Sequence, residues 1–329
     1  MPHSEIVLET IAAACNELHR YTDVKPPTFD ENWIVSRIDR RQSRIYSLLE
    51  PTTRLRLFYK ILHPSSDFYP HSSDSLSNLL SRTKDLTDRL FLQTAGMDVS
   101  PAPILSVDTD RRTIVSLGVE GRELSNSLAN PFPWTALSSD QLRQLGEACA
   151  CIEQCSRGRQ VDLDLEVFVH RVNVHLRRSE LDTRMADSLR SRLMELATAH
   201  SVDGNTVYVH GDLSPSNVLV ARRRVSLIDF VWFAGFPGFD LGLLSYRLQN
   251  RSGRWARSPQ LTKRLMEGYT MRVGNSHDLS SLTLVNLYLL VRGLGSKQSS
   301  TRNRAGSRLE CTVNASPRLG PDFRWWWES

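Results

Sequence analysis

A polar loop set between short apolar segments constrains this chain more than any other feature. Asp212 and Asn217 stand five residues apart in the pattern H-x-D-x4-N, which begins at His210. Asp229 follows the two short apolar runs that come next, and a basic turn joins those runs. Runs of this length predict paired strands. We therefore expect a tight loop after which Asn217 turns back as a strand begins, with Asp229 facing it from the end of the paired strand.

Phosphoryl transfer from a nucleotide requires this combination of side chains. The reaction needs an acceptor hydroxyl held in line and neutralisation of the phosphate charge, with little covalent chemistry. Asp212 suits the position next to the acceptor oxygen, and Asn217 with Asp229 suits a magnesium ion. Each residue alone also fits a turn or a strand end. Their order between apolar segments favours a phosphotransferase site.

The same stretch resembles the aminoglycoside phosphotransferase and choline kinase family, which consists of small-molecule kinases with the protein-kinase fold. The resemblance is strongest over residues 207–244. It includes the glycine-rich segment 235–242, which contains Asp240-Leu241. The resemblance implies an α+β, two-lobed protein-kinase-like fold with a small antiparallel-sheet N-terminal lobe and a larger, mainly helical C-terminal lobe. It also implies ATP and Mg²⁺ as cofactors.

The resemblance assigns a role to each polar residue of the stretch. It makes Asp212 the catalytic base or the group that orients the hydroxyl, and His210 a support of the loop. Asn217 and Asp229 become magnesium ligands that also bind the nucleotide. Asp240 is expected to anchor the catalytic loop from below without contacting substrate.

The front of the chain is expected to bind the nucleotide phosphates through a lysine on a central strand. Lys60, in the β-prone run 54–62, is the best candidate, and an exposed strand lysine is the alternative. The family places an acidic partner for this lysine on the following helix. Asp85 and Asp88 both fit that place, and we favour Asp88.

Two further parts of a nucleotide site leave weaker traces. Residues 117–121, including Glu120, resemble the hinge segment whose backbone binds adenine. Residues 37–44 occupy the place of the family's glycine-rich hairpin but contain no glycine. Arginines and the backbone amides of Gln42 and Ser43 are the expected substitutes.

Apolar periodicity predicts the other helices and strands and divides the chain into three regions. We expect a nucleotide-binding lobe with a leading helix over residues 1–120, a helical catalytic and acceptor-binding lobe over 121–295, and a poorly ordered basic tail over 296–329. The expected helices of the front region are 4–20 and 75–94, and its strands are 44–49, 54–62, 104–107 and 112–119. The helices expected C-terminal to the front region are 140–157, 165–178, 181–200, 260–273 and 280–292.

The acceptor is expected to be a small molecule with a hydroxyl group. Asp229 precedes Phe230-Val231 in place of the Phe-Gly of protein kinases, so a peptide substrate is disfavoured. From residue 243 onward the chain has 14 Lys and Arg residues against 5 Asp and Glu residues. This charge favours a neutral or anionic acceptor such as a sugar, sugar phosphate or glycolipid over a polycationic aminoglycoside-like one, and an amino alcohol is a further candidate. A non-catalytic nucleotide-binding scaffold and a kinase of membrane glycolipids, contacted through three adjacent tryptophans at 325–327, are the alternatives.

Composition and short sequence patterns narrow the location of the protein and the kinds of ligand that it binds. The longest apolar run, 282–291, is too short to span a membrane, and the first residues do not resemble a secretion signal, so we expect a cytoplasmic protein. Cys149, Cys151 and Cys155 fall in an expected helix, which favours small buried side chains over a metal site. Scattered arginines do not predict nucleic-acid binding. The oligomeric state stays open.

Overall fold

The protein was analysed as a computed structural model and divides into two compact units. The structure describes residues 8–23, 25, 27–30, 32–39, 43–63, 76–128, 137–222, 224–230, 232–251, 259–274, 279–296 and 305. The first unit contains Met1–Tyr69, Asp74–Gly121 and Leu219–Trp232, and the second contains Pro70–Ser73, Arg122–Val218 and Phe233–Ser329. The tail expected over 296–329, with its three tryptophans, lies outside the described residues except for Ser296 and Ala305.

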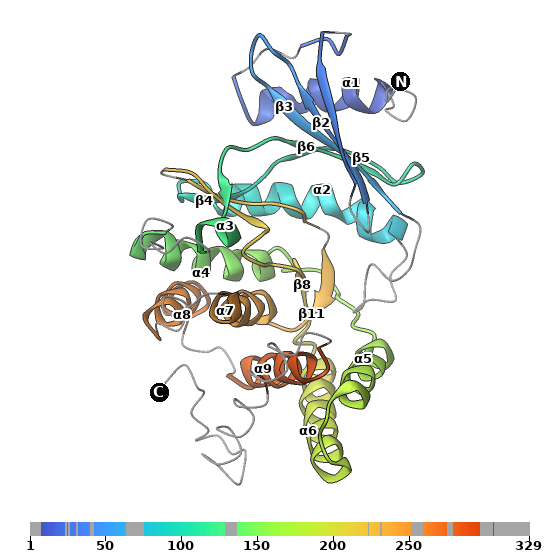
Figure 1. Cartoon of the computed structure of the whole chain (residues 1–329), viewed down its shortest axis with the longest axis vertical. Helices are drawn as coiled ribbons and strands as arrows, with labels where there is room; N and C mark the ends of the chain where they lie inside the picture. Colours follow the sequence, from blue (N-terminus) through green and yellow to red (C-terminus); the bar gives the residue numbers. More distant parts are fainter. Residues whose placement is uncertain are drawn as a thin grey trace. The chain divides into compact units, whose positions relative to one another are not determined.

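A five-stranded antiparallel sheet, of which Figure 1 labels β2, β3, β5 and β6, forms the centre of the first unit. The order of its strands is β1-β2-β3-β6-β5. Its strands are β1 (Ile34–Asp39), β2 (Ser43–Leu49), β3 (Arg56–Leu62), β5 (Ile104–Asp108) and β6 (Thr113–Leu117). Leu57 and Tyr59 of β3, two residues apart, are buried, as expected for a strand with one face on a core. The central position of β3 gives Lys60 a neighbour on each side, Ile45 in β2 and Ile114 in β6.

Two helices pack against the edge strand β5 of this sheet. The helices are α1 (Leu8–Glu17), followed by the 3-10 turn η2 (Leu18–Arg20), and α2 (Leu76–Gln93). Ile11, Leu18, Tyr46, Leu57 and Tyr59, all at most 1% exposed, belong to the core cluster between α1 and the sheet.

A later segment of the chain completes the first unit. The strands β4 (Val99–Pro101) and β10 (Val225–Leu227) pair in parallel. A tight turn, closed by the Ala221 amide donating to the Arg224 carbonyl at 2.8 Å, joins β10 to β9 (Val218–Val220). Buried Trp232 then donates from Nε1 to Thr87 of α2 at 3.0 Å. These contacts attach a segment far along the sequence to the N-terminal sheet unit.

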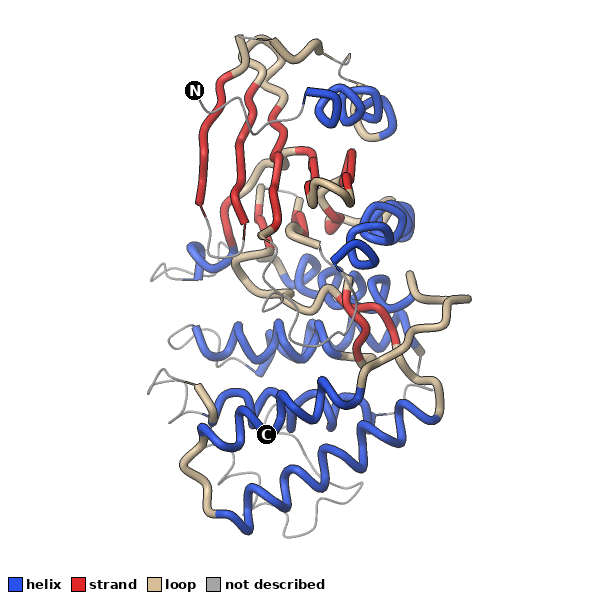
Figure 2. Tube along the Cα trace, turned by 90° about the vertical axis from the view of Figure 1, so that its right-hand side faces the viewer, coloured by secondary structure: helices blue, strands red, loops and turns tan. Residues whose placement is uncertain are grey.

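The second unit is mainly helical (Figure 2). Its helices are α3 (Leu124–Leu128), α4 (Ser139–Gln154), α5 (Leu165–Arg178), α6 (Thr183–Val202), α7 (Phe239–Arg251), α8 (Pro259–Val273) and α9 (Leu279–Leu294). Its strands are β7 (Arg122–Glu123) and the antiparallel pair β8 (Val207–Val209) and β11 (Phe233–Gly235). Side-chain caps fix three helix starts: Ser138 with Gln141 forms a capping box, and Asp164 and Asp182 cap α5 and α6.

Close contact between α4 and α8 depends on two glycines. A Cβ atom on Gly146 would lie 1.9 Å from the Leu265 carbonyl oxygen, and one on Gly268 would lie 1.8 Å from that of Arg143. The absence of a side chain therefore lets the two helix backbones approach one another. Helix α9, apolar around most of its surface, packs against α5, α6 and α7.

The structure also bears on the cysteines and on membrane insertion. Cys149, Cys151 and Cys155 are buried at α4 and its C-cap, as their helical reading predicts. Across the described ranges, no group of three or more His, Cys, Asp and Glu side chains is arranged to hold a metal ion. None of the helices that the structure describes has the length and apolar character needed to cross a membrane.

Candidate active site

The loop that carries Asp212 is held by a buried carboxylate of the second unit. Asp240, in the first turn of α7, is fully buried. Its Oδ2 accepts a hydrogen bond from the His210 amide at 2.7 Å, and its Oδ1 accepts one from the Gly211 amide at 2.9 Å. Burial raises the pKa of Asp240 to about 6, although His210 and the two amides act in the opposite direction. The anchoring role expected for Asp240 therefore has a direct structural counterpart.

Gly211 is required by the path of the loop. Its φ is +75°, a conformation that L residues with side chains rarely adopt. A Cβ atom there would also lie 2.3 Å from Cδ2 of the Phe233 ring. His210 is 1% exposed, and its Nδ1 faces the Asp212 amide at 3.4 Å. The buried His210 thus supports the loop, while the next two residues bring the chain to the surface.

Asp212 lies at the exposed end of this loop. Its side chain is 59% exposed, and its Oδ1 accepts a hydrogen bond from Nη2 of Arg247 at 2.8 Å. Nδ2 of Asn217 donates to the Asp212 carbonyl at 2.9 Å, which closes the loop and leaves the amide oxygen of Asn217 as an acceptor. Ser214 and Ser216 bond to each other at 2.8 Å, consistent with turn chemistry.

A second buried carboxylate, missed by the sequence analysis, supports the segment that leads into α7. Glu153 of α4 is 5% exposed. It accepts hydrogen bonds from the Gly238 amide at 2.6 Å and from the Tyr269 hydroxyl at 2.7 Å. Burial and this carboxylate raise the pKa of Tyr269. The only signal for it in the sequence was a carboxylate that directly follows the small and apolar residues 148–152.

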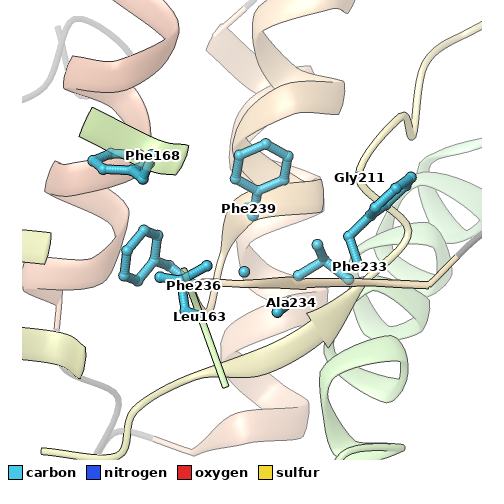
Figure 3. A pocket seen from close by; sticks show the side chains of 9 residues that line it. Leu163, Phe168, Gly211, Phe233, Ala234, Phe236 and Phe239 are labelled. Carbon is cyan, nitrogen blue, oxygen red and sulfur yellow. The ribbon is translucent and has the colours of Figure 1, made fainter. Parts of the chain in front are cut away.

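An apolar cavity lies beside the loop but is too small for a substrate. Its volume is about 20 Å³, room for one or two water molecules at most. Figure 3 shows the side chains that surround it, among them Phe168, Phe236 and Phe239. The lining residues are Leu163, Phe168, Val209, Gly211, Phe233, Ala234, Gly235, Phe236 and Phe239. The cavity therefore belongs to the packing behind Gly211, and the chemistry is expected on the exposed side of the loop.

The first unit presents a second exposed carboxylate. Asp229 follows β10, has φ of +67°, and is 46% exposed at its side chain. Nζ of Lys60 donates to Oδ1 of Asp229, and the Lys60 side chain is only 13% exposed. Asp is one of the few residues that tolerate this left-handed conformation. The structure thus brings together the two residues of this unit that were expected to bind the nucleotide phosphates and the metal.

The other residues expected at the nucleotide site lie elsewhere in the first unit. Asp88 accepts hydrogen bonds from the Tyr21 hydroxyl at 2.5 Å and from Lys84 at 2.8 Å. Asp85 pairs with Arg89 at 3.5 Å. The structure therefore does not bring Asp88 to Lys60, because α2 uses its acidic residues for contacts with its own lysine and arginine and with Tyr21. The pairing of Lys60 with Asp88 was predicted from distance along the sequence, which carries no information on where a side chain points.

The structure describes only part of the two segments that were expected to bind adenine and to cover the phosphates. Glu120 is exposed in the segment that follows β6. Ser43 begins β2, whereas Gln42 lies outside the described residues. Arg37 and Arg44 pair with Asp39 at 2.9 and 3.6 Å, so two arginines of this segment already have an acidic partner.

Each unit carries an oxygen atom of the kind that magnesium binds, and the first unit also carries a lysine suited to nucleotide phosphates. Mg²⁺ prefers oxygen ligands, and both the Asp229 carboxylate and the Asn217 amide oxygen supply them. A lysine ammonium group such as that of Lys60 is a usual partner for nucleotide phosphates. Since Asn217 belongs to the second unit and Asp229 to the first, their joint action stays a prediction.

Comparison with known proteins agrees with this chemistry. The sequence matches the model of the phosphotransferase enzyme family over residues 95–274, which is more than half of the chain. No curated protein matches it.

Solved structures identify the fold. A choline/ethanolamine kinase family protein from Mesorhizobium loti is similar with a TM-score of 0.53 and 14% identity, over 94% of this chain and 96% of that chain. A candidate fructosamine-3-kinase from Haemophilus somnus gives 0.51 and 10%, over 91% and 96%. One from Thermobifida fusca gives 0.50 and 15%, over 84% and 93%. The expected α+β, kinase-like fold is confirmed.

Both comparisons agree with the resemblance to aminoglycoside phosphotransferases and choline kinases that the motif around Asp212 indicated. The chain therefore belongs to the phosphotransferase enzyme family.

Proposed function

We propose that this protein is a magnesium-dependent kinase that transfers the γ-phosphate of ATP to a hydroxyl group of a small molecule. The observation that carries the proposal is the presentation of Asp212. Its carboxylate is exposed, while the backbone of the two preceding residues is fixed by the buried carboxylate of Asp240. Such an arrangement fits a group that must receive a mobile substrate at a fixed position.

Each residue then has a distinct task. Asp212 accepts the hydrogen bond of the acceptor hydroxyl, orients its oxygen and takes its proton as the phosphoryl group is transferred. Lys60 binds the nucleotide phosphates, and Asn217 and Asp229 hold the magnesium ion that neutralises them. The backbone near Glu120 is proposed to bind the base. His210 supports the loop and does not contact substrate.

We propose a neutral or anionic acceptor, such as a sugar or a sugar phosphate. A cationic acceptor is favoured by carboxylates that lack a positive partner, whereas Asp212 already has the Arg247 guanidinium at 2.8 Å. The names of the similar structures point to amino alcohols and fructosamines as further acceptors to test. A screen of phosphoryl transfer to glucose, glucose 6-phosphate, glucosamine, ethanolamine and a fructosamine would compare these charges directly.

Nucleotide binding tests the proposal independently of the acceptor. A ligand that binds only the folded state raises its stability, so Mg-ATP is expected to raise the melting temperature of the parent protein. Asp229→Ala should lose most of this shift, and Asp85→Ala, a change of a surface carboxylate in the same unit, should keep it. Parallel scans with Mg-GTP decide between the nucleotides. The absence of any shift in the parent would contradict the proposal and favour a non-catalytic scaffold.

A further inference from the structure

Helix α7 contacts the catalytic loop at two points. Asp240, in its first turn, accepts hydrogen bonds from the loop backbone, and Arg247, seven residues later, donates to the side chain of Asp212. Seven residues are close to two turns of a helix, so both side chains leave α7 on the same face. The helix therefore fixes the position of the loop with one residue and contacts its exposed carboxylate with the other.

The contact between Arg247 and Asp212 has little to contribute to folding. The side chains are 27% and 59% exposed. Ion pairs with such exposure add little to the stability of a protein, because water screens the attraction and both side chains lose freedom. Its effect on Asp212 is geometric: an exposed aspartate otherwise rotates among its staggered conformers.

The guanidinium group occupies only one oxygen of the carboxylate. Nη2 of Arg247 donates to Oδ1 of Asp212. Within the described part of the chain, Oδ2 of Asp212 accepts no hydrogen bond. The pair thus leaves one oxygen, on a carboxylate of defined orientation, for the hydroxyl group of an acceptor.

We propose that Arg247 is a positioning residue for phosphoryl transfer, which acts by holding Asp212 in the orientation that receives the acceptor hydroxyl. The inference rests on the proposed function of Asp212. It assigns to Arg247 an effect on turnover and none on nucleotide binding, because Arg247 acts through Asp212. Lysine at this place supplies the charge without the planar fork of donors, and is expected to restore part of the effect.

The test compares Arg247→Gln, Arg247→Lys and a matched control, Arg264→Gln. Arg264 is a half-exposed helical arginine of the same unit that pairs with Glu267 at 2.7 Å. Single-turnover release of phosphate from Mg-ATP, with water as acceptor, needs no knowledge of the natural substrate. Arg247→Gln should slow this step about 10- to 100-fold, the effect expected of a misplaced catalytic group, while Mg-ATP raises its melting temperature as much as that of the parent. Arg247→Lys should be intermediate, and Arg264→Gln should match the parent.

A double-mutant cycle identifies the residue through which Arg247 acts. In an Asp212→Asn background, Arg247→Gln should cause no further loss, because the group that it positions is already absent. Equal and additive losses in both backgrounds, or parent-like turnover of Arg247→Gln, would overturn the inference. Melting temperatures of all variants report folding. Failure of the proposed function itself has another signature, since the parent would then show no stabilisation by Mg-ATP.

Discussion

Two exposed carboxylates, one in each unit, are held in different ways. Asp229 of the first unit is paired with Lys60, a side chain of the central strand of a five-stranded sheet. Asp212 of the second unit lies on an irregular loop whose amides donate to the buried side chain of Asp240. The first unit therefore places a lysine of a regular backbone ladder next to its exposed carboxylate, and the second holds the loop of its exposed carboxylate through a buried side chain.

The difference has a physical cause. A strand satisfies its amides through its neighbours, so a sheet residue needs no further support. A loop has amides without such partners, and a buried amide without an acceptor is costly. Asp240 and Glu153 supply acceptors to the amides of His210, Gly211 and Gly238. The second unit is thus expected to be the more sensitive of the two to loss of a single carboxylate.

Removal of the carboxylate charge at Asp212 should have the largest effect on activity. Asp212→Asn preserves the size of the side chain but removes the base, and a general base contributes about 10²- to 10⁴-fold to a rate. We expect kcat to fall by this factor while Mg-ATP still raises the melting temperature. Asp229→Asn should have the opposite effect: nucleotide binding, measured as the rise in melting temperature with Mg-ATP, should be lost before kcat falls. Parent-like turnover of Asp212→Asn would contradict the assigned mechanism.

Loss of the carboxylate beneath the loop should have the next largest effect. Asp240→Ala leaves the His210 and Gly211 amides without their acceptor, so the loop can shift, and misplacement of a catalytic group by about 1 Å costs about 100-fold in rate. We expect kcat to fall about 10- to 100-fold, with the Mg-ATP shift retained because Lys60 and Asp229 are unchanged. Asp88→Ala, a partly buried carboxylate in the first unit, is the control and should leave kcat within about twofold of the parent.

Helix contacts of the second unit can be tested by a single methyl group. Alanine normally stabilises a helix relative to glycine by about 1 kcal/mol. At Gly268 the added Cβ would meet the Arg143 carbonyl, so we expect Gly268→Ala to lower the free energy of unfolding by about 1–3 kcal/mol. Thr270→Ala, at an exposed position of the same helix, should change it little. Urea unfolding curves measure both, and a stabilised Gly268→Ala protein would show that the helices separate easily.

Much of the fold could be predicted because periodicity is a local property. The sequence predicted α5 at its observed bounds, and it predicted α4 and the neighbouring strands β2 and β3 within a few residues. It missed α7, since glycines and a proline at 235–242 gave the start of that helix the composition of a loop.

The candidate site could be predicted only as a set of residues. Motif spacing selected Asp212, Asn217 and Asp229, and Lys60 was placed correctly on a central strand. The contact between Asp212 and Arg247 spans 35 residues, and no spacing rule connects them. The choice of Asp88 as the partner of Lys60 failed to anticipate its contacts with Tyr21 and Lys84 for the same reason. Pairings of this kind depend on tertiary packing.

The second unit depends on buried ionisable groups, so pH should have two opposing effects on the stability of the protein. The pKa of Asp240 is raised by burial from 3.8 to about 6, so the folded state binds this proton more tightly and stability rises as the pH falls from 6 toward 3.8. The pKa of His175 is lowered from 6.5 to about 4, chiefly by burial and also by Arg292, Arg178 and Arg171. Its folded state resists protonation, so stability falls as the pH drops from 6.5 toward 4.

Variants that cannot titrate separate the two effects. Asp240→Asn retains only the His175 effect and should lose more stability than the parent between pH 6.5 and 4. His175→Gln retains only the Asp240 effect and should gain stability over the same range. Hydrogen exchange followed by mass spectrometry assigns the change to a unit, because α5 and α7 peptides report the second and β2 and β3 peptides report the first. Equal changes in hydrogen exchange in both units would show that the units unfold together. The two units would then differ in how they hold Asp229 and Asp212, but they would not differ in stability.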